Sequence, residues 1–290
     1  MNNDISFFML YAIHWPIRKV AIFFSIVAFL ICQPFLSQAS DDQIKTLIQD
    51  LRSQNSKVSE AAEDALEKMK DPMAVEFLIP IALNEEESPV LRWHVIGILG
   101  AIKHNIATQP LLDIIRSTAK TPGDLPYGLF ERTIGDLSIR QKARYALANI
   151  GTSAVPYLTS ALNDNTPIVR KEAAKVLAVI ASGTLPSGEH VSSKEAVEVL
   201  MNAAKAKNLS IVASAYDFFI LKGDKKLEPI LVKALQHDGD KDMALSYLNS
   251  GNSVLKKAAI SWAKANGYNI TDSTSFPGGY NPYIRWGGKM

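Results

Sequence analysis

The sequence predicts an all-α protein, a right-handed α-solenoid in which roughly six to seven pairs of antiparallel helices stack side by side. The main observation is a nine-residue pattern that recurs along the chain. An aliphatic residue and an arginine are followed by alanine or valine at the fifth position and a large apolar residue at the ninth. The copies are Leu91–Leu99, Ile139–Leu147 and Val169–Leu177, with weaker copies at Ile211–Phe219 and Val254–Trp262.

The spacing of these copies supports a stacked repeat. Arg140 and Arg170 are 30 residues apart, whereas Arg92 and Arg140 are 48 apart. The additional residues fall in a Pro- and Gly-bearing insertion at 121–137. A pattern at helical spacing that returns every few tens of residues is typical of solenoids.

Apolar residues between the copies follow the helical period. In 43–51, for example, Ile44, Leu47, Ile48 and Leu51 form an i, i+3, i+4, i+7 stripe. No sustained alternation of period two is present, so strands are not expected. The remaining predicted helices cover 58–69, 74–84, 90–102, 108–117, 138–150, 154–162, 168–182, 194–205, 210–221, 228–236, 243–249 and 254–266.

Packing explains the small residue of the pattern. With about 100° per residue, Ala173, Leu177 and Ile180 fall within about 80° of Val169 on the helix surface. The alanine allows the paired helix to approach closely, and the large aliphatic side chains fill the layer between the two helices. We therefore expect this side of each second helix to face its partner.

The chain divides into a signal peptide (1–39), the solenoid (40–270, with insertions 121–137 and 183–191) and a tail (271–290). Arg18 and Lys19 precede an apolar run of about a dozen residues, and Ser37-Gln38-Ala39 is a small-x-small cleavage site. We expect cleavage after Ala39 and a periplasmic or secreted protein.

Two alternatives remain open at the N-terminus. The segment before Arg18 is also apolar, which lengthens the basic region of the signal. Residues 20–36 could instead be retained as an inner-membrane anchor, although the apolar run is short of the ~20 residues that span a bilayer. Translation from Met9 in place of Met1 would give a more regular signal.

Composition excludes several classes of function. The formal net charge is +2, so no global field favours nucleic acid or membrane. The single cysteine, Cys32, lies in the N-terminal segment, so the mature chain has no disulfide, thiolate nucleophile or cysteine metal site. The histidines lack helical metal-ligand spacing, and we find no phosphate-binding Gly-rich loop. We predict no catalytic residue, metal or cofactor.

The recurring pattern resembles the HEAT repeat, most closely the short HEAT-like repeats of phycobilisome lyases. Val169–Leu177 stands nearly complete as Val-Arg-x-x-Ala-Ala-x-x-Leu, and Asp164 matches the acidic residue six positions before the arginine. Glu86 stands in the same place before Arg92. The sequence departs from the family pattern at Ile134 in the acidic position and at Val212 and Leu255 in the arginine position.

The resemblance covers most of 41–266 and implies an architecture but no activity. It implies that the second helices line the concave side and that Arg170 is a structural arginine, paired with acids or with carbonyls between repeats. The third, sixth and seventh positions of the pattern would face this side. They also include Ile96 and Ala174, and we predict that the partner-binding residues are Trp93, Gln141, Arg144, Tyr145, Lys171, Lys175 and Tyr216.

The predicted function is that of an exported, non-catalytic scaffold that binds a protein or peptide partner on the concave side. The basic positions favour an acidic segment in that partner. Alternatively, Trp93 and Ile96 pack beneath a neighbouring loop. A second hypothesis is an enzyme or enzyme-accessory protein, lyase-like or for maturation, with a site in the groove under the 121–137 insertion.

The tail is the last candidate site. Its glycines and prolines exclude a regular helix, yet it is too apolar for an ordinary linker. We predict either a cap folded back over the last repeat or a peptide that docks into a partner. The docking residues would be Phe276, Tyr280, Tyr283 and Trp286.

Overall fold

The computed structural model describes residues 41–120, 135–183, 187–190, 192–272 and 284–288. Within these ranges the chain is helical and has no β-strand element. The predicted signal peptide, most of the first insertion and Phe276, Tyr280 and Tyr283 of the tail lie outside the described residues. No helix in the described ranges combines the length and the apolar character that a membrane span requires.

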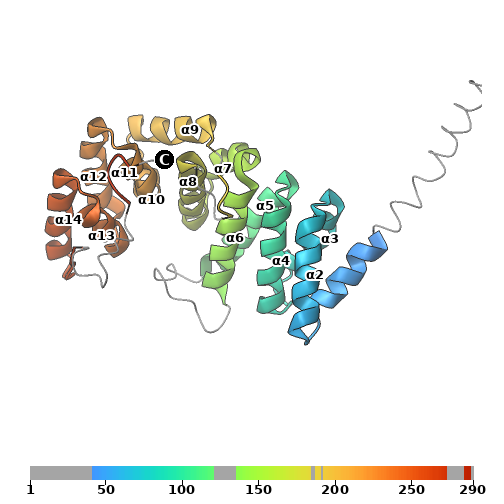
Figure 1. The fold of residues 1–290 in the computed structure, drawn as a ribbon. Coiled ribbons are helices and arrows are strands. Elements are labelled where there is room, and N and C mark those ends of the chain that lie inside the picture. The colour runs from blue at the N-terminus through green and yellow to red at the C-terminus, as the bar shows by residue number, and fades with distance from the viewer. Residues whose placement is uncertain (1–40, 121–134, 184–186, 191, 273–283, 289–290) are drawn as a thin grey trace, which may run out of the picture.

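The described helices form six pairs and one closing helix, which confirms the predicted solenoid (Figure 1). A helix over residues 41–51 precedes α2. The other helices are α2 (Ser56–Met69), α3 (Pro72–Leu83), α4 (Pro89–Ile102), α5 (Thr108–Ser117), α6 (Asp136–Ile150), α7 (Val155–Ala161), α8 (Pro167–Ser182), α9 (Lys194–Lys205), α10 (Leu209–Ser214), α11 (Tyr216–Lys222), α12 (Glu228–Asp238), α13 (Lys241–Asn249) and α14 (Ser253–Ala265).

Two details differ from the predicted helix boundaries. The helix expected over 210–221 is broken at Ala215, whose backbone leaves the helical region (φ −110°, ψ 21°) and separates α10 from α11. The first insertion ends earlier than predicted, because α6 already begins at Asp136.

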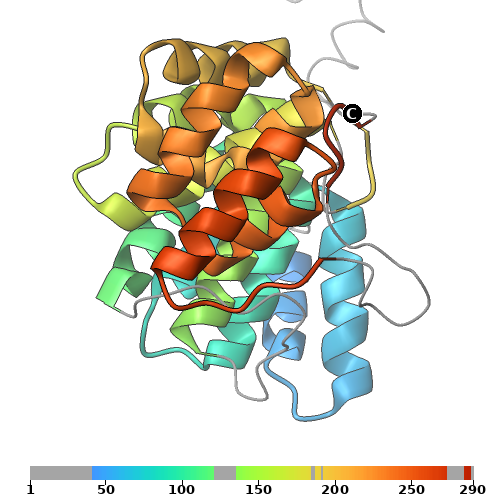
Figure 2. The same ribbon diagram turned by 90° about the vertical axis from the view of Figure 1, so that its left-hand side faces the viewer.

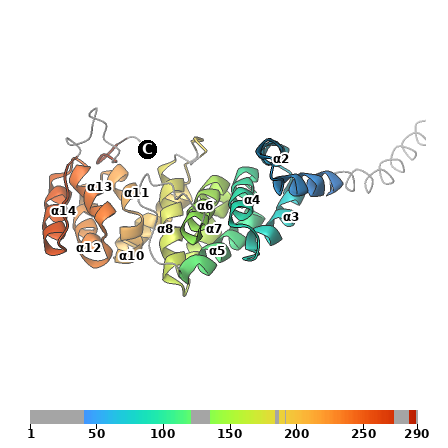
Figure 3. The same cartoon turned by 90° about the horizontal axis from the view of Figure 1, so that it is seen from below.

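The pairs follow one another in a row from α2 to α14, as Figures 1 and 3 show from two directions. The first helices α3, α5, α7 and α9 contact one another in succession, and so do the second helices α2, α4, α6, α8 and α10. The molecule therefore has two layers. We call the open side of the layer α2, α4, α6, α8, α10–α11 and α13 the second-helix face.

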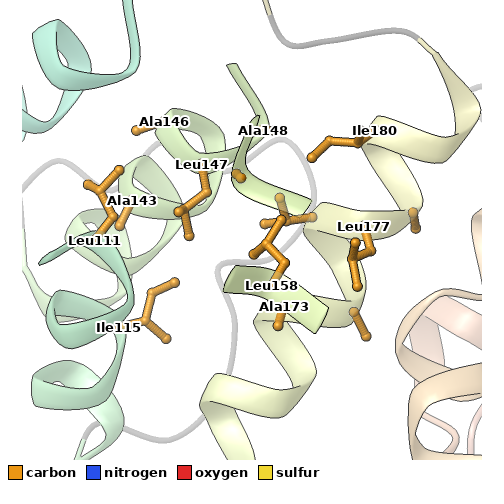
Figure 4. Packing of buried hydrophobic residues seen from close by; sticks show 14 of the residues in the cluster. Leu111, Ile115, Ala143, Ala146, Leu147, Ala148, Leu158, Ala173, Leu177 and Ile180 are labelled. Carbon is orange, nitrogen blue, oxygen red and sulfur yellow. The ribbon is translucent and has the colours of Figure 1, made fainter. Parts of the chain in front are cut away.

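One continuous apolar core runs between the layers from Ile44 to Ala259. Figure 4 shows its middle, where Leu111 of α5, Leu147 of α6 and Leu177 of α8 point into the space between the helices. Ala173 is completely buried, as its position in the pattern predicts.

The outward positions of the pattern are more buried than predicted. Ile96 and Ala174, which we expected on the open side, are completely buried. The reason is that an inner second helix contacts its own partner and also the second helices of both neighbouring pairs. Only a narrow strip of each second helix therefore reaches solvent.

The pattern arginines connect the second helices α4, α6 and α8 to the ends of their first helices. Arg92 and Arg140 are 6% and 2% exposed. Arg92 Nε donates to the carbonyl of Ala82 (3.0 Å), and Arg140 Nη1 donates to the carbonyl of Thr118 (3.1 Å). The last carbonyls of a helix have no partner within it, and a cation at that end is favourable. Both arginines are thus structural, as expected for Arg170, but their carbonyl partners lie within the same pair and not between repeats.

Arg170 makes the same contact in a more open setting. Its Nη1 donates to the carbonyls of Asp164 (2.6 Å) and Asn165 (3.2 Å) just beyond α7, and the side chain is half-buried. The Asp164 carboxylate accepts from Thr166 N–H and also from Arg116 of α5 (2.6 Å). The acidic residue of the pattern thus links two successive pairs.

The fifth pair shows why Val212 can replace the arginine. Its first helix, α9, ends with Lys207 in the left-handed region (φ 58°). Asn208 N–H donates to the carbonyl of Ala203 and Lys207 N–H to that of Ala204, both at 3.0 Å. This Schellman closure satisfies the terminal carbonyls of α9 with backbone donors, although it does not connect α9 to α10 as an arginine would.

Because Arg140 is buried and Arg170 is half-buried, we predict that their removal lowers the free energy of unfolding by different amounts. Arg140→Ala leaves a buried carbonyl and a cavity, so we expect a loss of about 3 kcal/mol or more in the free energy of unfolding. For Arg170→Ala we expect about 1 kcal/mol, because water can reach its carbonyls. Urea unfolding of both variants tests this order, and equal losses would contradict it.

Candidate partner-binding face

The seven predicted binding residues lie along the second-helix face, and none of them is completely buried. Tyr145 is the most open, with 43% of its surface exposed. The other six are half-buried. They come from α4, α6, α8 and α11, so the structure distributes the predicted residues over four consecutive pairs.

Trp93 is covered by a side chain of the neighbouring pair. Lys142 Nζ of α6 lies 3.7 Å from the centroid of the Trp93 ring, a cation–π contact. A Cβ on Gly97 would lie 2.6 Å from Lys142 Cε, so the missing side chain makes room for the lysine. Trp93 also packs against the core. Among the described residues, Trp93 therefore lies beneath a side chain of the next second helix.

Acidic residues of α2 surround this lysine. Burial lowers the pKa of Lys142, while Glu63 and Glu67 oppose that shift. Burial, together with the charge of Glu63, raises the pKa of Glu67. His94 Nδ1 lies 2.7 Å from Glu63 Oε2. The N-terminal part of the face is thus a network of opposite charges around Trp93.

In the middle of the face, charged side chains also pair with one another within the chain. Glu172 of α8 is completely buried, and its Oε2 accepts from Arg144 Nη1 (3.1 Å). Its Oε1 lies 3.6 Å from Lys175 Nζ. Two of the cations that we expected to attract an acidic partner are therefore engaged within the chain. Tyr145 is bracketed by Gln141 Nε2, 3.5 Å from its hydroxyl, and by the Arg144 guanidinium, 5.6 Å from its ring.

A cavity of about 480 Å³ opens between α8, α10–α11 and the turn before α13. Three of the predicted residues line it: Lys171, Lys175 and Tyr216. The α8 wall is basic, and the opposite wall carries carboxylates from the α12–α13 turn. Its other polar lining residues are Arg170, Asn208, Ser210, Ser214, Asp238 and Asp240.

An acidic group lies next to this cavity. Burial raises the pKa of Asp217 to about 7, and Asp240 adds to the shift, while Lys175 opposes it. Burial and the charge of Asp217 also raise the pKa of the neighbouring Tyr216 hydroxyl. The charge of this end of the face therefore changes close to neutral pH.

A second cavity, of about 510 Å³, lies beside Tyr145 on α6. Its wall includes Ser187 and Glu189 of the second insertion, which folds back onto earlier pairs. Ser187 N–H donates to Asn149 Oδ1 (3.0 Å), and Lys103 Nζ lies 2.5 Å from Glu189 Oε2. The second insertion, to which the sequence assigned no role, thus lines part of this cavity.

The structure describes only some of the remaining candidate residues, those of the tail and of the first insertion. Trp286 of the tail is half-buried against the core, and the other three tail residues lie outside the described ranges. Residues 121–134, under which the alternative enzyme site was expected, also lie outside them. In the part of the chain that the structure describes, no three His, Cys, Asp or Glu side chains gather as metal ligands.

Sequence analysis missed Glu172, Lys142 and the role of Gly97. Arg144 and Glu172 are 28 residues apart, close to the 30-residue spacing of the arginines in these two pairs. Opposite charges that are one repeat apart in the sequence could have predicted the ion pair between Arg144 and Glu172. Asp217 stood at an outward position of the pattern, but its effect on neighbouring groups depends on burial.

The structure is a row of helix pairs in two layers, and one layer carries two cavities. This arrangement is that of a helical-repeat scaffold. Family models agree with this class: HEAT repeats match residues 44–121, a HEAT repeat matches 154–184, and the PBS lyase HEAT-like repeat matches 139–164. The chain therefore contains HEAT repeats over residues 44–121 and 139–184. No curated protein sequence matches it.

Solved structures with similar helix arrangements include a designed armadillo repeat protein, at 15% identity and a TM-score of 0.30, with 76% of this chain and 98% of that chain covered. A second one, in complex with the peptide (KR)4, has 17% identity, a TM-score of 0.29 and the same coverage. Human deoxyhypusine hydroxylase in complex with glycerol has 14% identity and a TM-score of 0.21, with 80% and 98% covered. Because these TM-scores are below 0.5, the fold assignment rests on the helix pairs and the family matches.

Two glycines of α4 predict contrasting effects of an added methyl group. A Cβ on Gly100 would lie 2.6 Å from the Cα of Ala146 in α6, so Gly100→Ala should overpack the helix contact and cost about 1–3 kcal/mol. Gly97→Ala displaces only the flexible end of Lys142 and should not destabilise the helix. Thermal unfolding separates the two variants, and a shifted Trp93 indole resonance should report the displaced lysine. A larger loss for Gly97→Ala would contradict the geometry.

The raised pKa of Asp217 predicts a pH-dependent stability. The folded chain binds this proton more tightly than the unfolded chain, where the pKa is near 3.8. The stabilising contribution is therefore present below about pH 4 and is lost as the pH rises through about 7. Asp217→Asn should gain stability relative to the wild type across this range, measured by urea unfolding at several pH values. A difference that is constant with pH would contradict the assignment.

Proposed function

We propose that this protein is an exported, non-catalytic HEAT-repeat scaffold that binds a protein or peptide partner along its second-helix face. The observation that carries the proposal is the pair of cavities, each about 500 Å³, on this face. Both are lined by residues that the repeat pattern directs outward. The signal-like segment 1–39 supports export.

The chemistry of the face indicates how a partner would be held. Tyr145 beside one cavity and Tyr216 in the other offer aromatic surface with a polar end, the type of side chain that dominates binding energies at interfaces. The Arg144–Glu172–Lys175 network lies between them and is already neutralised. A partner segment that follows the strip therefore finds aromatic anchors at two points and mixed charges between them.

Charge then contributes selectivity more than affinity. Lys171 lies on the basic wall of the first cavity, while Asp238 and Asp240 face it from the α12–α13 turn. An acidic side chain of the partner would approach α8, and a basic one would approach the turn. The sequence predicted that the partner carries an acidic segment. In this proposal that segment would contact only the basic α8 wall.

Site-specific photocrosslinking in cells tests the proposal directly. A photoreactive amino acid replaces Tyr145 on α6 or, as a matched control, Tyr157 on α7. These tyrosines are 43% and 40% exposed but belong to opposite layers. We expect a discrete crosslinked partner from position 145 and not from position 157. The same partner crosslinked equally from both positions would contradict the proposed face.

Binding kinetics with the recovered partner extend the test. Tyr145→Ala should speed dissociation, with a loss on the order of 2 kcal/mol if it is a hot spot, whereas Tyr157→Ala should not. Lys171→Glu should slow association, and Lys233→Glu on α12 is its control. Unchanged kinetics in the face variants, with binding lost only on deletion of 273–290, would move the site to the tail.

A further inference from the structure

The described part of the tail, Ile284–Gly288, lies across the C-terminal ends of two second helices from different pairs. Trp286 N–H donates to the carbonyl of Ser250 at the end of α13 (2.8 Å), and Gly287 N–H donates to the carbonyl of Ile220 near the end of α11 (3.0 Å). In Figure 2, seen from the α14 end, this segment is the red piece next to the C label. The tail thus folds back onto α11 and α13.

The chemistry of this contact matches that of the pattern arginines. Arg285 Nη1 donates to the carbonyl of Asn249, the last residue of α13 (3.2 Å). Terminal carbonyls lack partners within their own helix and carry the negative end of the helix dipole. A guanidinium and two backbone N–H groups are therefore suitable donors for a surface made of two helix ends.

The shape of the contact is selective because it needs glycine. Gly223 ends α11 in the left-handed region (φ 63°), and a Cβ there would lie 2.4 Å from Gly287 Cα and 2.6 Å from Gly287 N. The two backbones can meet only because position 223 has no side chain. Gly288 also lies close to α11, because a Cβ on Gly288 would be 3.4 Å from Leu221 Cδ2.

The segment packs on the outside of the core, and none of its side chains is completely buried. Ile284 and Trp286 are half-buried against the core, and Arg285 is exposed. In α11 and α13, Phe218, Phe219 and Tyr247 are completely buried. Release of the segment therefore removes partly buried side chains and a few hydrogen bonds and leaves these buried aromatic side chains in place.

We propose that Ile220–Gly223 and Asn249–Gly251 form a peptide-recognition site, the C-terminal seat. Its ligand is a short peptide of the type Arg-aromatic-Gly-Gly, and the chain's own Ile284–Gly288 fills it in cis. The seat accepts the same peptide in trans when the cis segment is released. This site does not depend on the partner-binding face proposed above.

The test uses the full chain and a fluorescein-labelled peptide with the sequence of residues 283–290. Arg285→Ala/Trp286→Ala weakens the cis ligand and leaves the seat unchanged. In the wild type the tethered segment competes at high effective concentration. Fluorescence anisotropy should therefore show at least about tenfold tighter peptide binding by the double variant. A peptide with Arg285 and Trp286 exchanged should not bind.

Two glycine variants of this double variant provide the matched control. Gly223→Ala should abolish peptide binding, because its Cβ occupies the place of Gly287. Gly267→Ala has similar backbone strain (φ 73°), but its Cβ meets nothing within 4 Å, so binding should be retained. Circular dichroism confirms that each variant is folded. Absence of peptide binding by the folded double variant, or equal effects of the two glycine variants, would overturn the proposal.

Discussion

The architecture depends on how the last carbonyls of each first helix obtain donors. In three consecutive pairs those carbonyls, at or just beyond the helix end, accept from an arginine of the following second helix: Ala82 from Arg92, Thr118 from Arg140, and Asp164 from Arg170. An unpaired buried carbonyl is costly, so this bond fixes where the second helix starts relative to the end of the first. Stacking then follows, because each pair can bury its apolar side only against its neighbours.

Stacking in turn determines what remains for binding. Each inner second helix is enclosed on three sides, so residues such as Glu172 are buried and need partners within the chain. Arg144 and Lys175 supply them. The exposed strip is consequently a surface of aromatic side chains set among neutralised charges, with cavities at α6 and α8. Such a surface suits recognition of an extended partner more than long-range attraction of a charged one.

The sequence was sufficient to predict the fold, because the residues of the pattern have local packing roles that the three strongest copies repeat. Among the positions that it predicted to face outward, Tyr145 is exposed, and Lys171 and Tyr216 line a cavity. It could not predict that Lys142 covers Trp93, since that contact depends on the empty space at Gly97 in another pair. Nor could composition show that Trp286 folds onto Ser250, because a tail without periodicity does not reveal what it contacts.

Native-state hydrogen exchange tests the central role of the arginine contacts most directly. The amides of α4, α6 and α8, which each carry a pattern arginine near the N-terminal end, should exchange only through global unfolding of the chain. The amides of α10, where Val212 replaces the arginine, should exchange at least about tenfold faster through a partial opening. Equal protection in both groups, or slower exchange in α10, would contradict the account.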